Sequence, residues 1–467
     1  MRFLYNLAAI LIVTIIIPIF MLRATRERGF VERIKQSFGF YPQDTIDKVA
    51  GKNAIWVHAA SVGEIVATSP LVREFRKKFP DSPILVSVVT TGGYEMAHRI
   101  IKDADAIIYF PLDLPFLASR VVGRIRPRVF LPVETELWPN FLKKAKQLDV
   151  PVMMVNGRIS DRSVKQYKYL LGMLREMIGT VKCFAMQSSI DADYIMRLGA
   201  PRELVTVTGN TKFDQAYTSV SMEERAALIQ ELGLSGASHI MIAGSTHRGE
   251  EELVLAAFAA VRARDPKVRL IIAPREVLRT MEVEHLCRKA GFTVNTRKNL
   301  QKGAEGGEDI VILDTVGELG RVYGLGDVIY IGGSLIPHGG HNILEPAAHG
   351  KAIIVGNQMF NFKDIHALFR NRNAVVTVAN GAELTRETLR LFGDAYERER
   401  LERETLAIIN ENKGASAKSA QILVDLLTAY EARRALRAQE RISAHRVRAT
   451  QKVANFQTYF IDLVHDK

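Results

Sequence analysis

The stretch AIWVHAASVGE, residues 54–64, joins a short apolar run to a turn of small residues and then to a carboxylate. The apolar run has the length and composition of a buried strand. The small residues allow the backbone to turn tightly into a helix, which places Glu64 in the first helical turn. This succession of strand, turn and helix decides the fold, because it recurs along the chain.

Short apolar runs that predict strands occur in two groups, separated by a polar helical stretch at residues 214–236. The first group is residues 54–58, 83–89, 106–110, 129–132, 152–155 and 183–186, and the second is residues 239–243, 269–273, 292–295, 310–313, 328–331 and 352–355. Helical patterns lie between the runs, which predicts parallel sheets covered by helices on both faces. We expect an α/β protein with two doubly wound, Rossmann-like domains that face each other across a cleft.

The N-terminal residues 3–22, FLYNLAAILIVTIIIPIFML, contain no charge. As a helix they span about 30 Å, the thickness of a bilayer core, and they predict a transmembrane anchor. Basic residues follow the span at once and predict that the body lies on the cytoplasmic side of the inner membrane: Arg23, Arg26, Arg28, Arg33 and Lys35. A cleaved signal peptide and a buried core helix are the alternatives.

A chain of 467 residues exceeds the usual size of one hydrophobic core. The expected division is an anchor at 1–22, an N-terminal domain at 23–214, a linker at 215–236, a C-terminal domain at 237–425 and a basic extension at 426–467. In the extension, residues 431–452 carry many Arg and Lys side chains. They predict either a solvated helix or a patch for anionic lipid.

The composition excludes several classes of protein. Apolar residues make up 47% and charged residues 24%, which rules out a disordered chain, a collagen and a multi-span membrane protein. The net charge of +12 favours an anionic partner. Nucleic acid is not expected, because residues 431–452 contain no aromatic side chain that could stack on a base. The two cysteines, Cys183 and Cys287, form no disulfide framework and favour a reducing compartment.

Charged side chains follow the predicted strands of the first half. Glu64 is a candidate general base, although a helix N-terminus also favours a Glu for electrostatic reasons alone. Glu134 and Glu136 lie in ETELWPN, residues 134–140, where capping of the next helix is the alternative. Arg158, in NGRIS, offers a guanidinium suited to phosphate or carboxylate. Lys212, in GNTKFD, either offsets negative charge or lies in solvent.

The second half has turns that enter helices, where free N–H groups can bind an anion. They are AGSTHRGEE at 243–251, APRE at 273–276, TVGELG at 315–320 and GGSLIPHGGHNILEP at 332–346. The glycines of the last stretch allow a close approach to a ligand, and Glu345 can accept both hydroxyls of a ribose. His338 and His341 lack a third ligand nearby in the sequence, so no metal site is expected.

Taken in order, HAASVGE, VETELWPN, NGRIS, GNTKFD, AGSTHRGEE, APRE, TVGELG and GGSLIPHGGHNILEP resemble the motifs of the Kdo transferases. These bacterial enzymes add 3-deoxy-D-manno-octulosonic acid (Kdo) to a lipid A precursor. The resemblance covers the chain from the apolar N-terminus to about residue 425. It implies the GT-B fold of two Rossmann-like domains and the donor CMP-Kdo, with no metal and no cofactor.

The resemblance also implies roles for single residues. Glu64 would be the general base, and Glu134 and Lys212 would stabilise the transition state. The CMP pocket would be lined by Pro274, Arg275, Val316, Gly317, Glu318, Asn342, Ile343, Leu344 and Glu345. We further infer that Ser61 and Gly63 shape the acceptor side and that Arg158 binds a substrate carboxylate.

The expected reaction is direct attack by a glucosamine hydroxyl of the lipid on the anomeric carbon of Kdo, with inversion and departure of CMP. Another GT-B enzyme of nucleotide sugars, such as a sugar-nucleotide epimerase, is the first alternative. A membrane-tethered nucleotide-binding module without catalysis is the second.

Overall fold

The structure, a computed structural model, describes residues 2–24, 29–159, 171–215 and 220–465. Within these ranges it does not describe the side chains of residues 2, 16–24, 171, 441–442 and 444–465. The chain forms two compact units. Unit 1 comprises residues 1–215 and 414–467, and unit 2 comprises residues 216–413.

Unit 1 is built on a seven-stranded parallel sheet with the order β3-β2-β1-β4-β5-β6-β7. Its strands are β1 (Ile55–His58), β2 (Ile84–Val88), β3 (Ala106–Tyr109), β4 (Val129–Pro132), β5 (Val152–Gly157), β6 (Val181–Met186) and β7 (Val205–Val207). Ile55 of β1 pairs with Ile84 on one side and with Val129 on the other. The strand order reverses between β1 and β4, and ligands of doubly wound sheets bind at the carboxyl ends of strands at this point.

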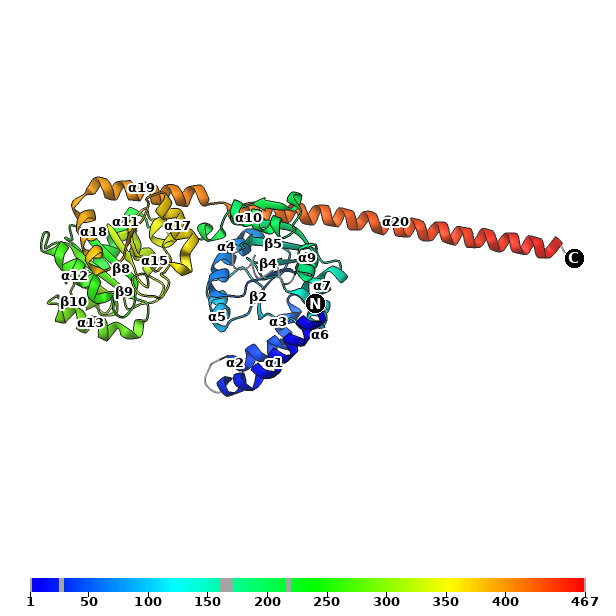
Figure 1. Ribbon diagram of the computed structural model, residues 1–467, viewed down its shortest axis with the longest axis horizontal. Coiled ribbons are helices and arrows are strands. Elements are labelled where there is room, and N and C mark those ends of the chain that lie inside the picture. Colours follow the sequence, from blue (N-terminus) through cyan, green and yellow to red (C-terminus); the bar gives the residue numbers. More distant parts are fainter. Residues whose placement is uncertain (1, 25–28, 160–170, 216–219, 466–467) are drawn as a thin grey trace. The chain divides into compact units, whose positions relative to one another are not determined.

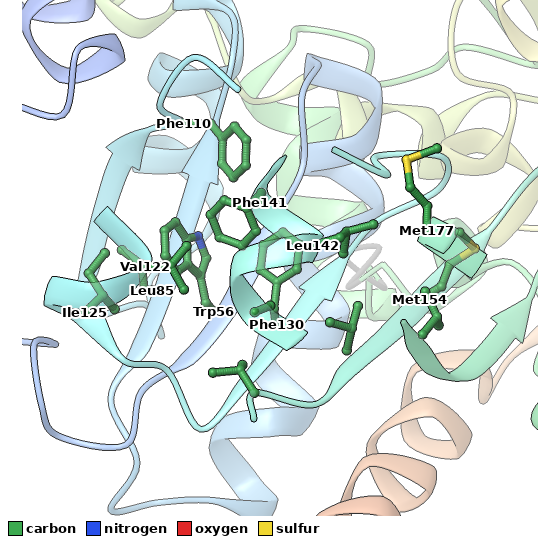
Figure 2. Close-up of a cluster of buried hydrophobic side chains, with 14 of the residues drawn as sticks. Trp56, Leu85, Phe110, Val122, Ile125, Phe130, Phe141, Leu142, Met154 and Met177 are labelled. Carbon is green, nitrogen blue, oxygen red and sulfur yellow. The ribbon is translucent and has the colours of Figure 1, made fainter. Parts of the chain in front are cut away.

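Helices cover both faces of this sheet (Figure 1). They include α4 (Val62–Lys78), α5 (Thr91–Ile100), α6 (Pro115–Ile125), α7 (Pro139–Gln147), α9 (Leu171–Ile178) and α10 (Ser189–Arg197). Trp56 of β1 points to one face and makes edge contacts with Phe130 and Phe141 (Figure 2). Its neighbours Ile55 and Val57 belong to the cluster on the other face. The alternation along β1 is that of a strand buried on both sides.

The N-terminal segment forms α1 (Arg2–Ala24), followed by α2 (Phe30–Ser37) and α3 (Gln43–Asp47). The start of α1 contacts unit 1, because Tyr5 donates a hydrogen bond to Asp113 over 3.0 Å. Asn6 accepts one from Asn140 over 2.9 Å. Among the described residues, none of the helices combines the length and the apolar character needed to cross a membrane. The expected anchor therefore stays a prediction from the sequence.

The C-terminal helix α20 (Ala415–His465) returns to unit 1. Asp214 accepts hydrogen bonds from the backbone N–H groups of Gly414 and Ser416, both over 2.6 Å. Leu423 and Leu427 are buried in the same cluster as β1. The expected domain boundary at residue 425 therefore differs from the observed crossing at 413–414, because the first turns of α20 complete the core of unit 1.

Unit 2 has a second seven-stranded parallel sheet, of order β10-β11-β9-β8-β12-β13-β14. Its strands are β8 (Ile240–Thr246), β9 (Arg269–Pro274), β10 (Val294–Thr296), β11 (Ile310–Ile312), β12 (Val328–Ile331), β13 (Ala352–Gly356) and β14 (Val376–Val378). Its helices include α11 (Met222–Glu231), α12 (Glu251–Arg262), α13 (Thr280–Lys289), α14 (Arg297–Gln301), α15 (Leu319–Val322), α16 (Leu344–Ala348), α17 (Lys363–Asn371), α18 (Gly381–Gly393) and α19 (Ala395–Asn412). The expected linker at 215–236 thus contributes α11 to this unit, where Leu228 and Leu232 are buried.

All twelve predicted strands are confirmed, and so are the two doubly wound sheets. The sequence did not reveal β7 and β14, each of which forms one edge of its sheet. Both have the sequence Val-Thr-Val and are partly exposed. Three residues at a sheet edge bury too little apolar surface to stand out as an apolar run.

Candidate active site

Glu64 lies in the first turn of α4, next to the carboxyl end of β1. The helix begins at Ser61, whose hydroxyl oxygen accepts from the N–H of Glu64 and donates to Oε1 of the same residue over 2.8 Å. The backbone N–H of Ala60 donates to Oε2 over 2.8 Å. The carboxylate is therefore held at both oxygens. Ser61 is occupied in holding Glu64, and Gly63 is exposed, with no atom closer than 4.0 Å to the site of a Cβ.

Two further carboxylates lie near Glu64 at the end of β4. Glu134 adopts a left-handed backbone with φ 55, and its N–H donates to the carbonyl of Val155 over 3.1 Å. Glu136 accepts a hydrogen bond from Trp138 Nε1 over 3.0 Å. The ammonium of Lys212 lies 3.6 Å from Oε1 of Glu134. The structure thus gathers Glu64, Glu134 and Lys212 at one edge of the sheet.

Burial, together with the negative charges of Glu136 and Glu134, raises the pKa of Glu64 to about 7. The hydrogen bonds from Ala60 and Ser61 act in the opposite direction. A carboxylate whose pKa lies near neutral pH can take a proton from a hydroxyl and release it again. The pKa suits a general base, and the hydrogen bonds with Ser61 are those of a carboxylate in the first turn of a helix.

Arg158 follows the carboxyl end of β5 and is half-buried. It therefore lies at the same edge of unit 1 as the carboxylates. Ser160, the last residue of the NGRIS motif, lies outside the described residues.

The expected donor residues gather at the carboxyl edge of the other sheet. Pro274 ends β9, and the N–H of Arg275 donates to the carbonyl of Thr246 over 3.0 Å. The carbonyl of Gly320, in α15, contacts His349 Nε2 over 2.7 Å, which joins α15 to the end of α16. Arg275 lies close enough to Glu345 to lower its pKa, although burial has the larger effect and raises it.

The stretch from Val316 to Glu318 enters α15. Val316 is 75% exposed, and Gly317 has a left-handed backbone with φ 96. Glu318 accepts hydrogen bonds from the Thr315 hydroxyl and from Arg297. Burial opposes the effect, but these hydrogen bonds lower the pKa of Glu318, so it is ionised at neutral pH.

At the start of α16, the Asn342 amide donates to Glu345 over 3.2 Å. Asn342 also accepts from the N–H of Leu344 over 3.0 Å. Ile343 and Leu344 are buried, so only their backbone groups can face a ligand. The expectation that these four residues line a CMP pocket stays a prediction, in which Asn342 and Glu345 contribute side chains and Ile343 and Leu344 their backbone.

The sequence did not single out Glu250, the residue before α12. Its carboxylate is fully buried and accepts hydrogen bonds at 2.6–3.1 Å from the hydroxyl of Tyr330 and from the N–H groups of His247, Gly333, Ser334 and Leu335. Three consecutive N–H groups of the glycine-rich loop thus donate to the Glu250 side chain. These N–H groups at the start of the loop are therefore already hydrogen-bonded and do not bind a phosphate of the ligand.

The structure brings a third histidine to His338 and His341. His247 Nε2 lies 2.8 Å from His341 Nε2, and its ring lies 3.9 Å from that of His338, measured between centroids. Burial lowers the pKa of His341 to about 4, so the ring is neutral at pH 7. Within the described part of the chain, no group of three His, Cys, Asp or Glu side chains is arranged to hold a metal ion.

A cavity of about 990 Å³ lies in unit 1 at the opposite edge of the sheet. It is lined by residues that precede β1, β2, β4 and β5 and by α20, including Arg128, Asp149 and Glu431. None of the expected site residues lines it. Residues that follow the C-terminal ends of α6 and α7 lie here, and Arg128 forms an ion pair with Glu431.

Known proteins match the chain over most of its length. Residues 32–215 match the family profile described as 3-deoxy-D-manno-octulosonic-acid transferase (kdotransferase). A 3-deoxy-D-manno-octulosonic acid transferase of Haemophilus influenzae is 32% identical over 430 residues, which covers 92% of this chain and 98% of the relative. The transferase of Bordetella pertussis is 30% identical over 382 residues, 80% of this chain and 87% of the relative.

Among solved structures, the UDP-GlcNAc 2-epimerase of Neisseria meningitidis matches 80% of this chain and 100% of its own, with a TM-score of 0.52 and 12% identity. This likeness concerns the fold alone, because the fold supports several reactions of nucleotide sugars. The sequence identity to the transferases is the more specific result. The chain belongs to the 3-deoxy-D-manno-octulosonic acid transferase family of glycosyltransferases.

Proposed function

We propose that the enzyme transfers Kdo from CMP-Kdo to a glucosamine hydroxyl of a lipid A precursor, with inversion at the anomeric carbon and without a metal. The observation that carries this proposal is Glu64, which is held at both carboxylate oxygens and has a pKa near 7. Glu64 removes the proton of the attacking hydroxyl as the bond to CMP breaks. Such general base catalysis contributes about 10²–10⁴-fold.

The charges near Glu64 support the remaining roles in unit 1. As the bond to CMP lengthens, positive charge develops on the Kdo ring. Glu134 stabilises this charge, and the ammonium of Lys212 lies 3.6 Å from its Oε1. Arg158 binds the carboxylate of Kdo. Ser61 and Gly63 border the acceptor, and Ser61 also positions Glu64.

Unit 2 binds the donor nucleotide in this proposal. Arg275 neutralises the charge of the departing phosphate, a task that a metal performs in other enzymes. Glu345 accepts the ribose hydroxyls, and Asn342 orients Glu345 through its amide. Pro274, the backbone of Ile343 and Leu344, and the stretch from Val316 to Glu318 border the nucleotide.

We also propose that α1 attaches the enzyme to the inner membrane, with the body on the cytoplasmic side. Large apolar side chains of α1 are exposed, which supports a lipid partner: Phe3, Leu4, Leu7, Ile10, Leu11, Ile12 and Ile15. The basic residues 431–452 favour anionic lipid as a second contact. Recovery of the full-length protein in the supernatant after membrane sedimentation, without detergent, would contradict the attachment.

The test of the reaction is incubation with CMP-Kdo and a tetra-acylated lipid A precursor, followed by mass spectrometry of the lipid. We expect products heavier by whole Kdo units. Glu64→Gln should lower the rate of transfer by about 10²–10⁴-fold while CMP still binds. Conversion of a UDP-sugar with no transfer from CMP-Kdo would favour the epimerase alternative. CMP binding without any turnover by the wild type would favour a non-catalytic module.

A further inference from the structure

Asn156, the residue at the carboxyl end of β5 before Gly157, has an unfavourable backbone. It is fully buried and adopts a left-handed conformation with φ 51. Asn adopts this conformation more readily than most residues, but Gly would do so at no steric cost. A strained backbone persists only where the surrounding contacts hold it in place, and such residues cluster at functional sites. The side chain of Asn156 is therefore the feature to explain.

Asn156 is one of three neighbouring amide residues, which we call the amide network: Asn156, Gln187 and Asn210. The Gln187 amide donates to the backbone carbonyl of Asn156 over 3.0 Å. In turn, Gln187 accepts from the Asn210 amide over 3.0 Å. These contacts join the end of β5 to the end of β6 and to the segment that follows β7.

The amide network holds the short helix η3 (Thr211–Asp214), which carries Lys212. The side-chain oxygen of Asn156 accepts from the N–H of Thr211 over 3.0 Å. That of Asn210 accepts from the N–H of Lys212 over 3.0 Å. Two consecutive N–H groups of η3 are thus bound by two members of the network, which fixes both the position and the direction of this helix.

The same helix is tied to α4, the helix of Glu64. The hydroxyl of Thr211 donates to the carbonyl of Ala67 over 2.8 Å. The amide of Gln215 donates to the carbonyl of Val66 over 2.8 Å. Both carbonyls lie within one turn of Glu64. Lys212 therefore has a fixed place relative to both Glu64 and the end of β5.

We propose that the amide network positions Lys212 against Glu134, so that Asn156, Gln187 and Asn210 are positioning residues for the reaction. The result of the arrangement is the 3.6 Å contact between Lys212 Nζ and Glu134 Oε1. This Glu134 oxygen is buried and accepts no hydrogen bond. The position of the Lys212 ammonium therefore determines the electrostatic field at this oxygen. The inference rests on the proposed function, in which Glu134 and Lys212 stabilise the transition state.

The decisive variant is Asn156→Gly in the full-length enzyme, because glycine relieves the strain and removes the amide together. Asn373→Gly is the matched control, since Asn373 has the same backbone conformation with φ 50 in unit 2 and lies on the surface. We expect Asn156→Gly to lower kcat for Kdo transfer at least tenfold, with the KM for CMP-Kdo changed less than twofold. Asn373→Gly should leave both constants unchanged.

A second variant guards against a loss of folding. Gln187→Met keeps the volume of a half-buried side chain and removes both of its hydrogen bonds, so it should lower kcat with no loss of CMP binding. Unchanged kcat in both variants, with an active wild type, would overturn the positioning role. Equal losses in kcat and in thermal stability for both variants would overturn it too, since they would indicate a structural role. A wild type that transfers no Kdo would instead refute the proposed function.

Discussion

At the scale of single residues, the enzyme places its charged groups in surroundings that change their proton affinity. Glu64 and Glu345 both have raised pKa values because of burial, whereas Glu318 has a lowered one through its bonds to Thr315 and Arg297. Glu64 differs from the other two because two further carboxylates lie near it. Like charges favour its protonated form, which suits the proton-accepting role that we propose for it.

Glu64 should make the rate depend on pH. Its pKa of about 7 in the folded enzyme means that the base is protonated, and inactive, in acid. We expect kcat for Kdo transfer to rise tenfold per pH unit below about pH 7 and to level off above it. Glu64→Gln should lower kcat by about 10²–10⁴-fold and remove this limb of the profile. A wild-type limb centred near pH 4.5 would show that Glu64 is not perturbed.

The same residue should affect stability in the opposite sense. A carboxyl whose folded pKa is raised stabilises the fold below its unfolded pKa, and this contribution is lost as the pH rises through about 7. We expect Glu64→Gln to melt at a higher temperature than the wild type at pH 8, and the difference to disappear near pH 5. Thermal unfolding followed by circular dichroism at the two pH values measures the effect. A difference independent of pH would contradict it.

At the scale of elements, loops after strands carry the candidate site, and buried polar groups hold these loops. Glu250 binds the start of the glycine-rich loop, and the Ser334 hydroxyl accepts from the N–H of Gly356 over 2.7 Å. Gly332 packs so closely on the end of β8 that a Cβ would lie 2.3 Å from the carbonyl oxygen of Ser245. These contacts therefore fix the start of the loop against the ends of β8, β12 and β13.

Glu250→Gln should loosen this loop. An amide offers one acceptor oxygen and presents its NH₂ group to donors, so buried N–H groups lose their partner at a cost of about 1–3 kcal/mol. We expect lower thermal stability and a KM for CMP-Kdo raised several-fold. Glu252→Gln, exposed on the same helix, is the control and should change neither. An unchanged KM in a destabilised Glu250→Gln enzyme would limit Glu250 to a structural role.

The sequence predicted the elements well, because the buried strands of both sheets form apolar runs that alternate with helices. The strands β7 and β14 were missed, since each is a three-residue Val-Thr-Val segment, too short and too polar to form an apolar run. Glu64, Glu134 and Lys212 were predicted as a group, and the structure brings them together. Glu250 and the amide network were not found, because their roles depend on backbone groups from distant segments that no local pattern displays.

At the scale of the whole molecule, a substitution in the core of one unit should lower the stability of that unit and leave the other unit unchanged. Leu423 is fully buried in unit 1, whereas Leu436, on the same helix, is 57% exposed. Leu423→Ala should destabilise unit 1 by about 2–5 kcal/mol, and Leu436→Ala should change stability by less than about 0.5 kcal/mol. Calorimetry of the full chain measures both. Equal effects would mean that α20 does not pack on unit 1.

The donor nucleotide should raise the thermal stability of unit 2. At a concentration of 100 times its Kd, CMP adds about 2.7 kcal/mol to the stability of the unit that binds it. We expect CMP to raise the melting transition of unit 2, the transition that Leu423→Ala leaves in place. Arg275→Ala should reduce this shift. A shift confined to the transition that Leu423→Ala lowers would place the nucleotide on unit 1.

The division of unit 1 between both ends of the chain has a consequence for biosynthesis. Unit 2 is one continuous segment, whereas unit 1 needs residues 1–215 and the stretch that begins at Gly414. At about 5–20 residues per second, a ribosome needs roughly 10–40 s between residue 215 and residue 430. Unit 1 is therefore the first unit to be translated and the last to be completed. The apolar face of α4 that α20 covers stays exposed while the intervening residues are synthesised.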